Sequence, residues 1–171
     1  MLLFIDGSVN PVLKIGYGSH LLIPENELDD VTEKSIRQTI RSRKFSPTTS
    51  TKLEAQTLLW ALGETEKILE EEAKDDLITI FTDSQNLVEL PKRRARLESR
   101  NFKSRKDGKD LKNADLYKSI YNILDRLNFR FVKVSGHSKL NKKNRIEWIF
   151  AQVDRSSRRA LRKDRKAGKT S

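Results

Sequence analysis

Four acidic residues occupy positions from which their carboxylates could act together. Asp6 and Asp83 each follow an apolar run, Glu54 opens a helical pattern after a Ser/Thr-rich loop, and Asp154 lies among apolar helix neighbours. Carboxylates are hard oxygen ligands of the kind that Mg²⁺ and Mn²⁺ prefer. Four of them in one place would repel one another strongly without divalent cations. The four acids therefore predict a metal site.

Each acid also has a purely structural interpretation. Asp6 could belong to a turn, and Asp83 could cap the helix that follows it. Glu54 could be a first-turn acid that the helix dipole favours. Asp154, beside Arg155 and Arg158, could form a surface ion pair on its helix. The four positions taken together favour one shared site over four unrelated structural roles.

Five strands are expected to position these acids. They cover residues 2–6, 15–23, 35–45, 77–82 and 129–135. The first and fourth are short apolar runs that lead into an acid, which is typical of buried strands. The second returns from the first as a hairpin across the Asn10-Pro11 turn. The third depends on partial alternation, with Ile36, Gln38 and Ile40 on one face.

Apolar residues at helical spacing separate the strands. Leu58 and Leu62 belong to a long helix that we expect to begin at an N-cap, Ser50 or Thr51, and to end near residue 72. Further helices are expected over residues 86–90, ending before Pro91, over 116–127 and over 146–161. This order of elements in 171 residues indicates one α/β domain.

Two segments concentrate the positive charge of the chain, whose formal net charge is +11. Residues 92–112 hold ten basic and three acidic residues, and residues 155–171 hold eight basic residues and one acidic residue. Such concentrated charge predicts a polyanionic partner. The alternative is a solvated helix face followed by a disordered tail.

The composition excludes several other classes of protein. The chain has no cysteine, which excludes a disulfide framework and a thiolate zinc site. No apolar run reaches the length of a membrane span, and the first residues lack the basic start and cleavage site of a secretory signal. We therefore expect a cytoplasmic protein without a membrane partner.

The same residues resemble the type 1 ribonuclease H family over roughly residues 1–161. The similar signatures are Phe4-Ile5-Asp6-Gly7-Ser8, Gly16-Tyr17-Gly18, Thr49 to Glu54, Thr82-Asp83-Ser84-Gln85, Lys112-Asn113-Ala114-Asp115-Leu116 and Gly136-His137. The resemblance implies a ribonuclease H-like α/β fold. In that fold a five-stranded mixed sheet, with its first three strands antiparallel, is flanked by helices.

The resemblance assigns the four acids to a catalytic site with two Mg²⁺ ions, which Mn²⁺ could replace. Asp6 would bridge both ions, Asp154 would complete the site that holds the attacking water, and Glu54 and Asp83 would hold the ion on the leaving-group side. His137 matches a mobile loop histidine that would protonate the product or help its release.

The resemblance also implies six substrate-binding residues. Asn10, Ser50, Thr51 and Gln85 match positions that touch the minor groove, where an RNA strand displays its 2′-hydroxyls. Thr49 and Asn113 match a pocket for a phosphate of the DNA strand. Residues 92–112 correspond to a substrate-binding protrusion, whose contribution would be independent of sequence and sensitive to salt.

Together these features predict a monomeric endoribonuclease that cuts the RNA strand of RNA–DNA hybrids and leaves 3′-hydroxyl and 5′-phosphate ends. The catalytic domain is expected over residues 1–165, with a basic, disordered tail over 166–171. Asp164 is the alternative to Asp154 as the fourth acid. Two other functions stay open: a related nuclease acting on structured DNA or double-stranded RNA, and a nucleic-acid-binding module without turnover.

Overall fold

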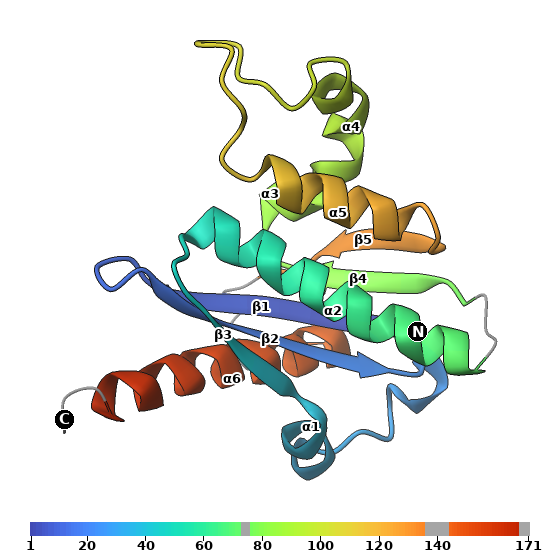
Figure 1. The fold of residues 1–171 in the computed structure, drawn as a ribbon. Coiled ribbons are helices and arrows are strands. Elements are labelled where there is room, and N and C mark those ends of the chain that lie inside the picture. The colour runs from blue at the N-terminus through green and yellow to red at the C-terminus, as the bar shows by residue number, and fades with distance from the viewer. Residues whose placement is uncertain (73–75, 136–143, 168–171) are drawn as a thin grey trace.

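A five-stranded mixed sheet organises the chain, and its central strand is the first one (Figure 1). The computed structural model describes residues 1–72, 76–135 and 144–167. The strands are β1 (Leu2–Asn10), β2 (Ile15–Ile23), β3 (Arg41–Phe45), β4 (Ile78–Thr82) and β5 (Phe129–Lys133), in the spatial order β3-β2-β1-β4-β5. The first three strands pair antiparallel, whereas β4 and β5 join parallel to β1. The predicted fold class is confirmed.

The register of β1 brings two of the predicted site residues to neighbouring strand positions. Phe4 of β1 lies opposite Phe81 of β4 in a parallel pair. Asp6 and Asp83 each follow two residues later, just beyond the end of the β1–β4 pairing. Ligands of open α/β sheets gather at such strand ends. The predicted first strand, residues 2–6, is too short, because β1 continues past Asp6 to Asn10 beside β2.

Helices cover both faces of the sheet (Figure 1). The long helix α2 (Ser50–Glu72) and α5 (Ala114–Leu124) lie on one face, and α6 (Arg145–Ala167) lies on the other with the short α1 (Glu33–Thr39). Successive side chains of β1 point to opposite faces. Leu3 and Ile5 therefore join the α2 core, while Leu2 and Phe4 join the α6 core.

Two glycines of β2 let α2 approach the sheet closely. A Cβ atom added to Gly18 would lie 2.1 Å from the Thr57 hydroxyl, and one added to Gly16 would lie 2.7 Å from the Leu53 side chain. Both partners belong to the first turns of α2. The missing side chains thus set the height of Glu54, which lies on the same turns, above the sheet.

The predicted third strand is partly wrong, because residues 33–39 form α1 and only Arg41–Phe45 is extended. Thr32 and Ser35 form a reciprocal capping box, in which each side chain accepts a hydrogen bond from the other residue's backbone amide. This box satisfies two of the amides that a helix start leaves unpaired. Ile36 is buried by the helix, in the same core as Leu2 and Phe4.

A helix does end before Pro91, as the sequence pattern predicted, but Pro91 itself lies in the first turn of another helix. The helix α3 (Gln85–Val88) is followed at once by α4 (Leu90–Glu98), with Pro91 in the first turn of α4. Proline suits that position because its missing amide hydrogen would have no helical partner there. The short 3₁₀ helix Glu25–Glu27 completes the described elements.

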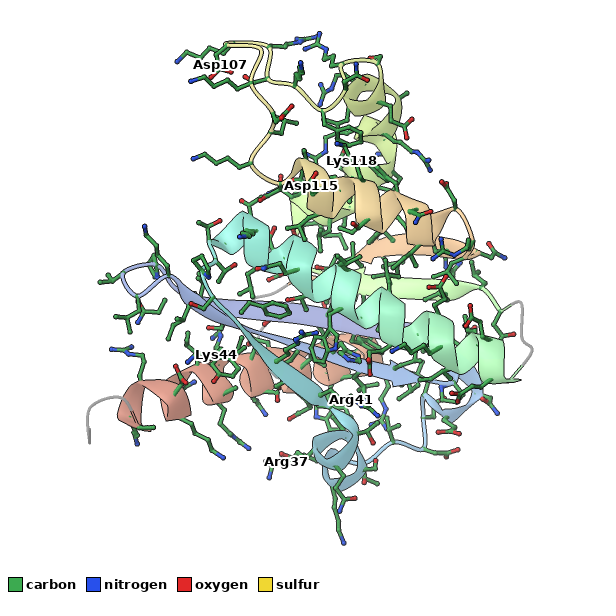
Figure 2. The ribbon with its side chains drawn as sticks, in the orientation of Figure 1. Arg37, Arg41, Lys44, Asp107, Asp115 and Lys118 are labelled. Carbon is green, nitrogen blue, oxygen red and sulfur yellow. The ribbon has the colours of Figure 1, made fainter. Side chains whose placement is uncertain are left out.

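The basic residues 92–112 form a projection at one end of the molecule (Figure 1). This basic protrusion consists of most of α4 and a loop, in which Lys103 and Asp110 form an isolated antiparallel bridge. Asp107 lies at the outer end of this loop in Figure 2. Phe102 is buried against Tyr121 of α5, which anchors the loop to the domain.

The last helix extends two residues beyond the predicted domain boundary at residue 165, to Ala167. Residues 168–171 lie outside the described part of the chain. Among the described helices, none combines the length and the apolar character that crossing a membrane requires.

Candidate active site

A polar cavity of about 300 Å³ lies where β1, α2, α6 and the end of β4 meet. Asp6, Glu54, Asp83 and Asp154 all line it. The structure therefore brings together the four acids that the sequence singled out, from four different elements. Ser50, the first residue of α2, lines the same cavity.

Asp6 is bound by a side chain of α6 and lies among like charges. The Ser157 hydroxyl of α6 donates a hydrogen bond to Asp6 Oδ2 at 2.7 Å. Burial raises the pKa of Asp6 to about 7; the hydrogen bond from Ser157 opposes this rise, and the charges of Asp154 and Asp83 add to it. A buried carboxylate next to like charges is a site that a cation would stabilise.

Ser84 connects the Glu54 carboxylate to the end of β4. The Ser84 hydroxyl donates to Glu54 Oε2 at 2.7 Å and accepts a hydrogen bond from the Leu87 amide at 3.3 Å, which caps α3. One hydroxyl therefore fixes both the start of α3 and the orientation of Glu54. Asp83, directly before Ser84, is exposed at the mouth of the cavity.

Asp154 forms an ion pair with Arg158, one turn further along α6, at 2.7 Å. Asp154 therefore forms the ion pair of the structural interpretation and also lines the cavity. The alternative acid, Asp164, lies about 15 Å further along the helix axis. It accepts hydrogen bonds from Lys44 at 2.8 Å and from Tyr17 at 3.1 Å, and the Lys44 ammonium lowers the pKa of Asp164. Among the described acids of α6, Asp154 is therefore the one that shares the cavity.

The donor set fits a hard divalent cation, because all four side chains offer carboxylate oxygens. Within residues 1–72, 76–135 and 144–167, no three acidic or histidine side chains are gathered closely enough to hold a metal ion as they stand. Asp6, Glu54 and Asp154 are instead bound by protein donors: Ser157, Ser84 and Arg158 respectively. Metal binding would require these carboxylates to exchange such donors for the ion.

Three of the predicted substrate-binding residues lie around the start of α2. Ser50 reaches the cavity, and Thr51 is exposed on the first turn. Thr49 precedes the helix, and its hydroxyl accepts a long hydrogen bond of 3.4 Å from the Lys52 amide. The helix begins at Ser50, so Thr49 takes the capping position that we expected of Ser50 or Thr51.

The other three predicted substrate-binding residues lie on separate elements. Asn10 Oδ1 accepts hydrogen bonds from the two backbone amides of Val12 and Leu13 and so holds the hairpin turn. Gln85 begins α3 and accepts a hydrogen bond from Lys133 at 2.6 Å. Asn113 is the N-cap residue of α5, without a capping bond from its side chain. His137 lies outside the described residues.

Sequence reasoning missed the roles of Ser84, Ser157 and Arg158 at the site. Ser157 and Arg158 follow Asp154 by three and four residues, which places them near its face of a helix. That spacing could have predicted that both side chains lie near Asp154. The sequence analysis considered Arg158 only as a partner in a surface ion pair. Ser84 follows the second strand-end acid and has the residue type of a helix cap.

Comparisons with known proteins identify a family and a fold. Residues 1–160 match the family described as RNase H. The fold is similar to that of a foamy viral protease–reverse transcriptase in complex with double-stranded DNA, with 15% identity, a TM-score of 0.57, and coverage of 89% of this chain and 92% of that one.

A second similar structure is the native protease–reverse transcriptase of Prototype Foamy Virus. It is 17% identical with a TM-score of 0.62, and the match covers 92% of this chain but 20% of that one. At these identities the likeness shows the fold alone. No curated protein sequence matches the chain significantly.

Proposed function

The chain belongs to the RNase H family, and from this membership we propose that it is a metal-dependent endonuclease that hydrolyses the RNA strand of RNA–DNA hybrids. The family accounts for a nuclease domain that acts on nucleic acid. The choice of strand, the metal dependence and the individual residue roles are our proposal.

The observation that supports it best is the shared cavity of Asp6, Glu54, Asp83 and Asp154. These side chains would hold two Mg²⁺ ions. When bound, the ions would supply an activated water and neutralise the charge that develops on the phosphate. The raised pKa of Asp6 fits this role, since its burial and its acidic neighbours both disfavour an uncompensated charge.

The residues around the carboxylates would prepare this site. Ser157 and Ser84 orient Asp6 and Glu54 through hydrogen bonds of 2.7 Å each. Arg158 would leave Asp154 when a metal binds, and its guanidinium would then contact a substrate phosphate at the mouth of the cavity. His137 would take the proton-transfer or product-release role that the family resemblance implies.

Replacement of one carboxylate tests the assignment. We expect Asp83→Asn to abolish Mg²⁺-dependent cleavage of a labelled hybrid, because the neutral amide is a poorer metal ligand, while hybrid binding at low salt persists. Asp164→Asn is the matched control and should cleave at the wild-type rate, because Asp164 lies outside the cavity. Wild-type cleavage by Asp83→Asn would show that the two-metal assignment is wrong.

A substrate panel distinguishes the proposal from a related nuclease activity. The panel contains an RNA–DNA hybrid, an RNA duplex, a DNA duplex and the single strands, each labelled at one end. We expect cleavage of the RNA strand of the hybrid, with 3′-hydroxyl and 5′-phosphate ends. Preferred cleavage of a duplex of one kind would instead assign a different substrate to the same site.

A titration distinguishes an enzyme from a binding module without turnover. We expect calorimetry to show Mg²⁺ or Mn²⁺ binding that Asp83→Asn weakens. A wild-type chain that binds the hybrid but neither ion would be the binding module.

A further inference from the structure

The outward face of α6 presents a row of cationic side chains. We call this set the outer row; its members, which line one shallow groove, are Arg155, Arg159, Arg162, Lys163 and Lys166. All five are exposed. The spacing of three and four residues is that of one helix face. The opposite face of α6 is buried against the sheet through Ile149, Phe150 and Val153.

Most of the outer row has no acidic partner in the described structure. Two acids of α6 lie near the outer row, and each pairs with a cation outside it. Asp154 pairs with Arg158, and Asp164 pairs with Lys44 of β3. Arg155, Arg159 and Lys163 form no ion pair with any described acid. Like charges three or four residues apart on a helix repel one another, so an external anion would stabilise this face.

The outer row continues directly from the candidate active site. Arg158 lines the cavity of the four carboxylates, and Arg155 and Arg159 flank it in the helix. From Arg155 to Lys166 the helix rises by about 16 Å. One strand of a duplex presents about five phosphates over that length.

The row also lies on the other side of the sheet from the basic protrusion. In Figure 1, α6 crosses one face of the sheet, while α4 projects beyond α5 on the opposite side. A duplex centred on the cavity would therefore meet one cationic region on either side of the cut site.

We propose that the outer row binds the sugar–phosphate backbone of the substrate duplex beyond the cut site. This inference rests on the proposed function, because it takes the cavity as the place of cleavage. The row contains only cationic side chains, so it lacks the exposed apolar face with which amphipathic helices enter a lipid surface. A regular polyanion is the partner that matches its charge and length.

The test compares two variants of the protein for binding to the hybrid. One lacks three positive charges of the outer row, and the control lacks three positive charges elsewhere on the surface. Binding is measured by fluorescence anisotropy in the Asp83→Asn background with chelator. We expect Arg155→Gln/Arg159→Gln/Arg162→Gln to weaken binding of a 20-base-pair hybrid about 30-fold or more at low salt. The salt slope of log K should fall by about 3, because three phosphate contacts are lost.

Three comparisons make this measurement specific. The control Lys34→Gln/Arg37→Gln/Lys67→Gln removes the same charge from exposed positions on α1 and α2, outside the outer row and the cavity, and should change binding less than about 3-fold. The charge-preserving variant Arg155→Lys/Arg159→Lys/Arg162→Lys should bind like wild type. A hairpin-closed hybrid of about 6 base pairs, which extends only about 10 Å on either side of a central cut site, should lose less affinity in the outer-row variant than the long hybrid does.

The outcomes separate this inference from the proposed function. If the outer-row variant binds the long hybrid as the control does, the inference is wrong while the function stands. The inference is also wrong, while the function stands, if the outer-row variant loses affinity for anionic phosphatidylserine vesicles and keeps its affinity for the hybrid. If the Asp83→Asn protein with its outer row intact binds no nucleic acid, the proposed function itself fails. Thermal melting of each variant confirms that the compared proteins are folded.

Discussion

The basic protrusion and the outer row of α6 have similar charge but use their cations differently. Residues 92–112 carry a net charge of +7, and residues 155–167 carry +6. In the protrusion, Arg94 binds Glu98 and Asp125 and lies 5.1 Å from the ring centre of Tyr121. In the outer row, Arg155, Arg159 and Lys163 form no ion pair with a described acid.

This difference follows from what each helix can bury. Leu90 is the only described residue of α4 that is fully buried, so hydrophobic packing contributes little to holding this helix. The ion pair of Arg94 with Asp125, at the end of α5, adds to this attachment. By contrast, α6 buries Ile149, Phe150 and Val153 beneath the sheet, so hydrophobic packing holds this helix. A basic segment can therefore contain a cation with a structural role, such as Arg94, beside cations that no described acid binds.

The largest effect is expected when an acid is placed within the outer row, because its cations then gain an ion-pair partner as Arg94 has in the protrusion. In Arg159→Glu, the new carboxylate lies one turn from Arg155, Arg162 and Lys163 and can pair with them. We expect hybrid affinity to fall about 10-fold or more at low salt, since two units of charge are lost at the phosphate-binding face. Because the new pairs favour the helix, the thermal unfolding midpoint should not fall.

Anisotropy titration and thermal melting check both parts of this prediction. Lys67→Glu, an equal charge reversal on α2, is the control and should leave hybrid affinity within about 3-fold. A fall of equal size in the control would show that total charge, and not the outer row, sets the affinity.

Removal of Arg94 should affect stability and leave hybrid binding largely intact. Arg94→Ala loses two acidic partners and the stacking on Tyr121. We expect a fall of about 2–4 °C in the unfolding midpoint, the size typical of losing one modest interaction network in a domain of this length. Calorimetric melting measures it.

The control for Arg94 lies on the same helix. Arg96 is exposed and forms no ion pair among the described residues, so Arg96→Ala should change the midpoint by less than about 1 °C. Equal falls for the two variants would mean that α4 depends on its charge as a whole and not on the Arg94 contacts.

The smallest effect should be a pH-dependent one at Asp125. The Arg94 guanidinium holds the pKa of Asp125 below its usual value of 3.8. A carboxylate with a lowered pKa in the folded state adds stability above its unfolded pKa, and this stability is lost as the pH falls through the folded value. The midpoint difference between wild type and Asp125→Asn should therefore be full at pH 6 and vanish toward pH 2.

A melting series from pH 2 to pH 6 measures this difference. In an Arg94→Ala background, Asp125→Asn should show no such pH dependence, because the ion pair is already broken. If the Asp125→Asn difference stays constant across the series, the Arg94–Asp125 pair does not contribute through its charge.

Short-range patterns predicted most of the fold. The second strand was expected over residues 15–23 and is observed at Ile15–Ile23, because its apolar run and flanking turns are local features. Ile36 and Ile40 misled the prediction, since residues four apart share a helix face and also share a strand face. The capping box of Thr32 and Ser35 decided between the two.

The candidate site could be predicted in its acids but not in their partners. Asp6 lies in β1 and Asp83 directly follows β4, the parallel neighbour of β1, so the apolar run before each acid was enough to predict that the two meet. Ser157 reaches Asp6 only because α6 is turned about its axis by the packing of Ile149 and Val153 beneath the sheet. Such long-range packing leaves no trace in the spacing of α6 itself.

The close packing of α2 on β2 affects how variants of this chain should be interpreted. An alanine in place of Gly18 would bring a methyl group within 2.1 Å of the Thr57 hydroxyl, and the helix that carries Glu54 would have to lift. A displacement of about 1 Å at a catalytic group can lower a rate about 100-fold. On the proposed function, a Gly18→Ala chain would keep all four acids and still lose most of its activity.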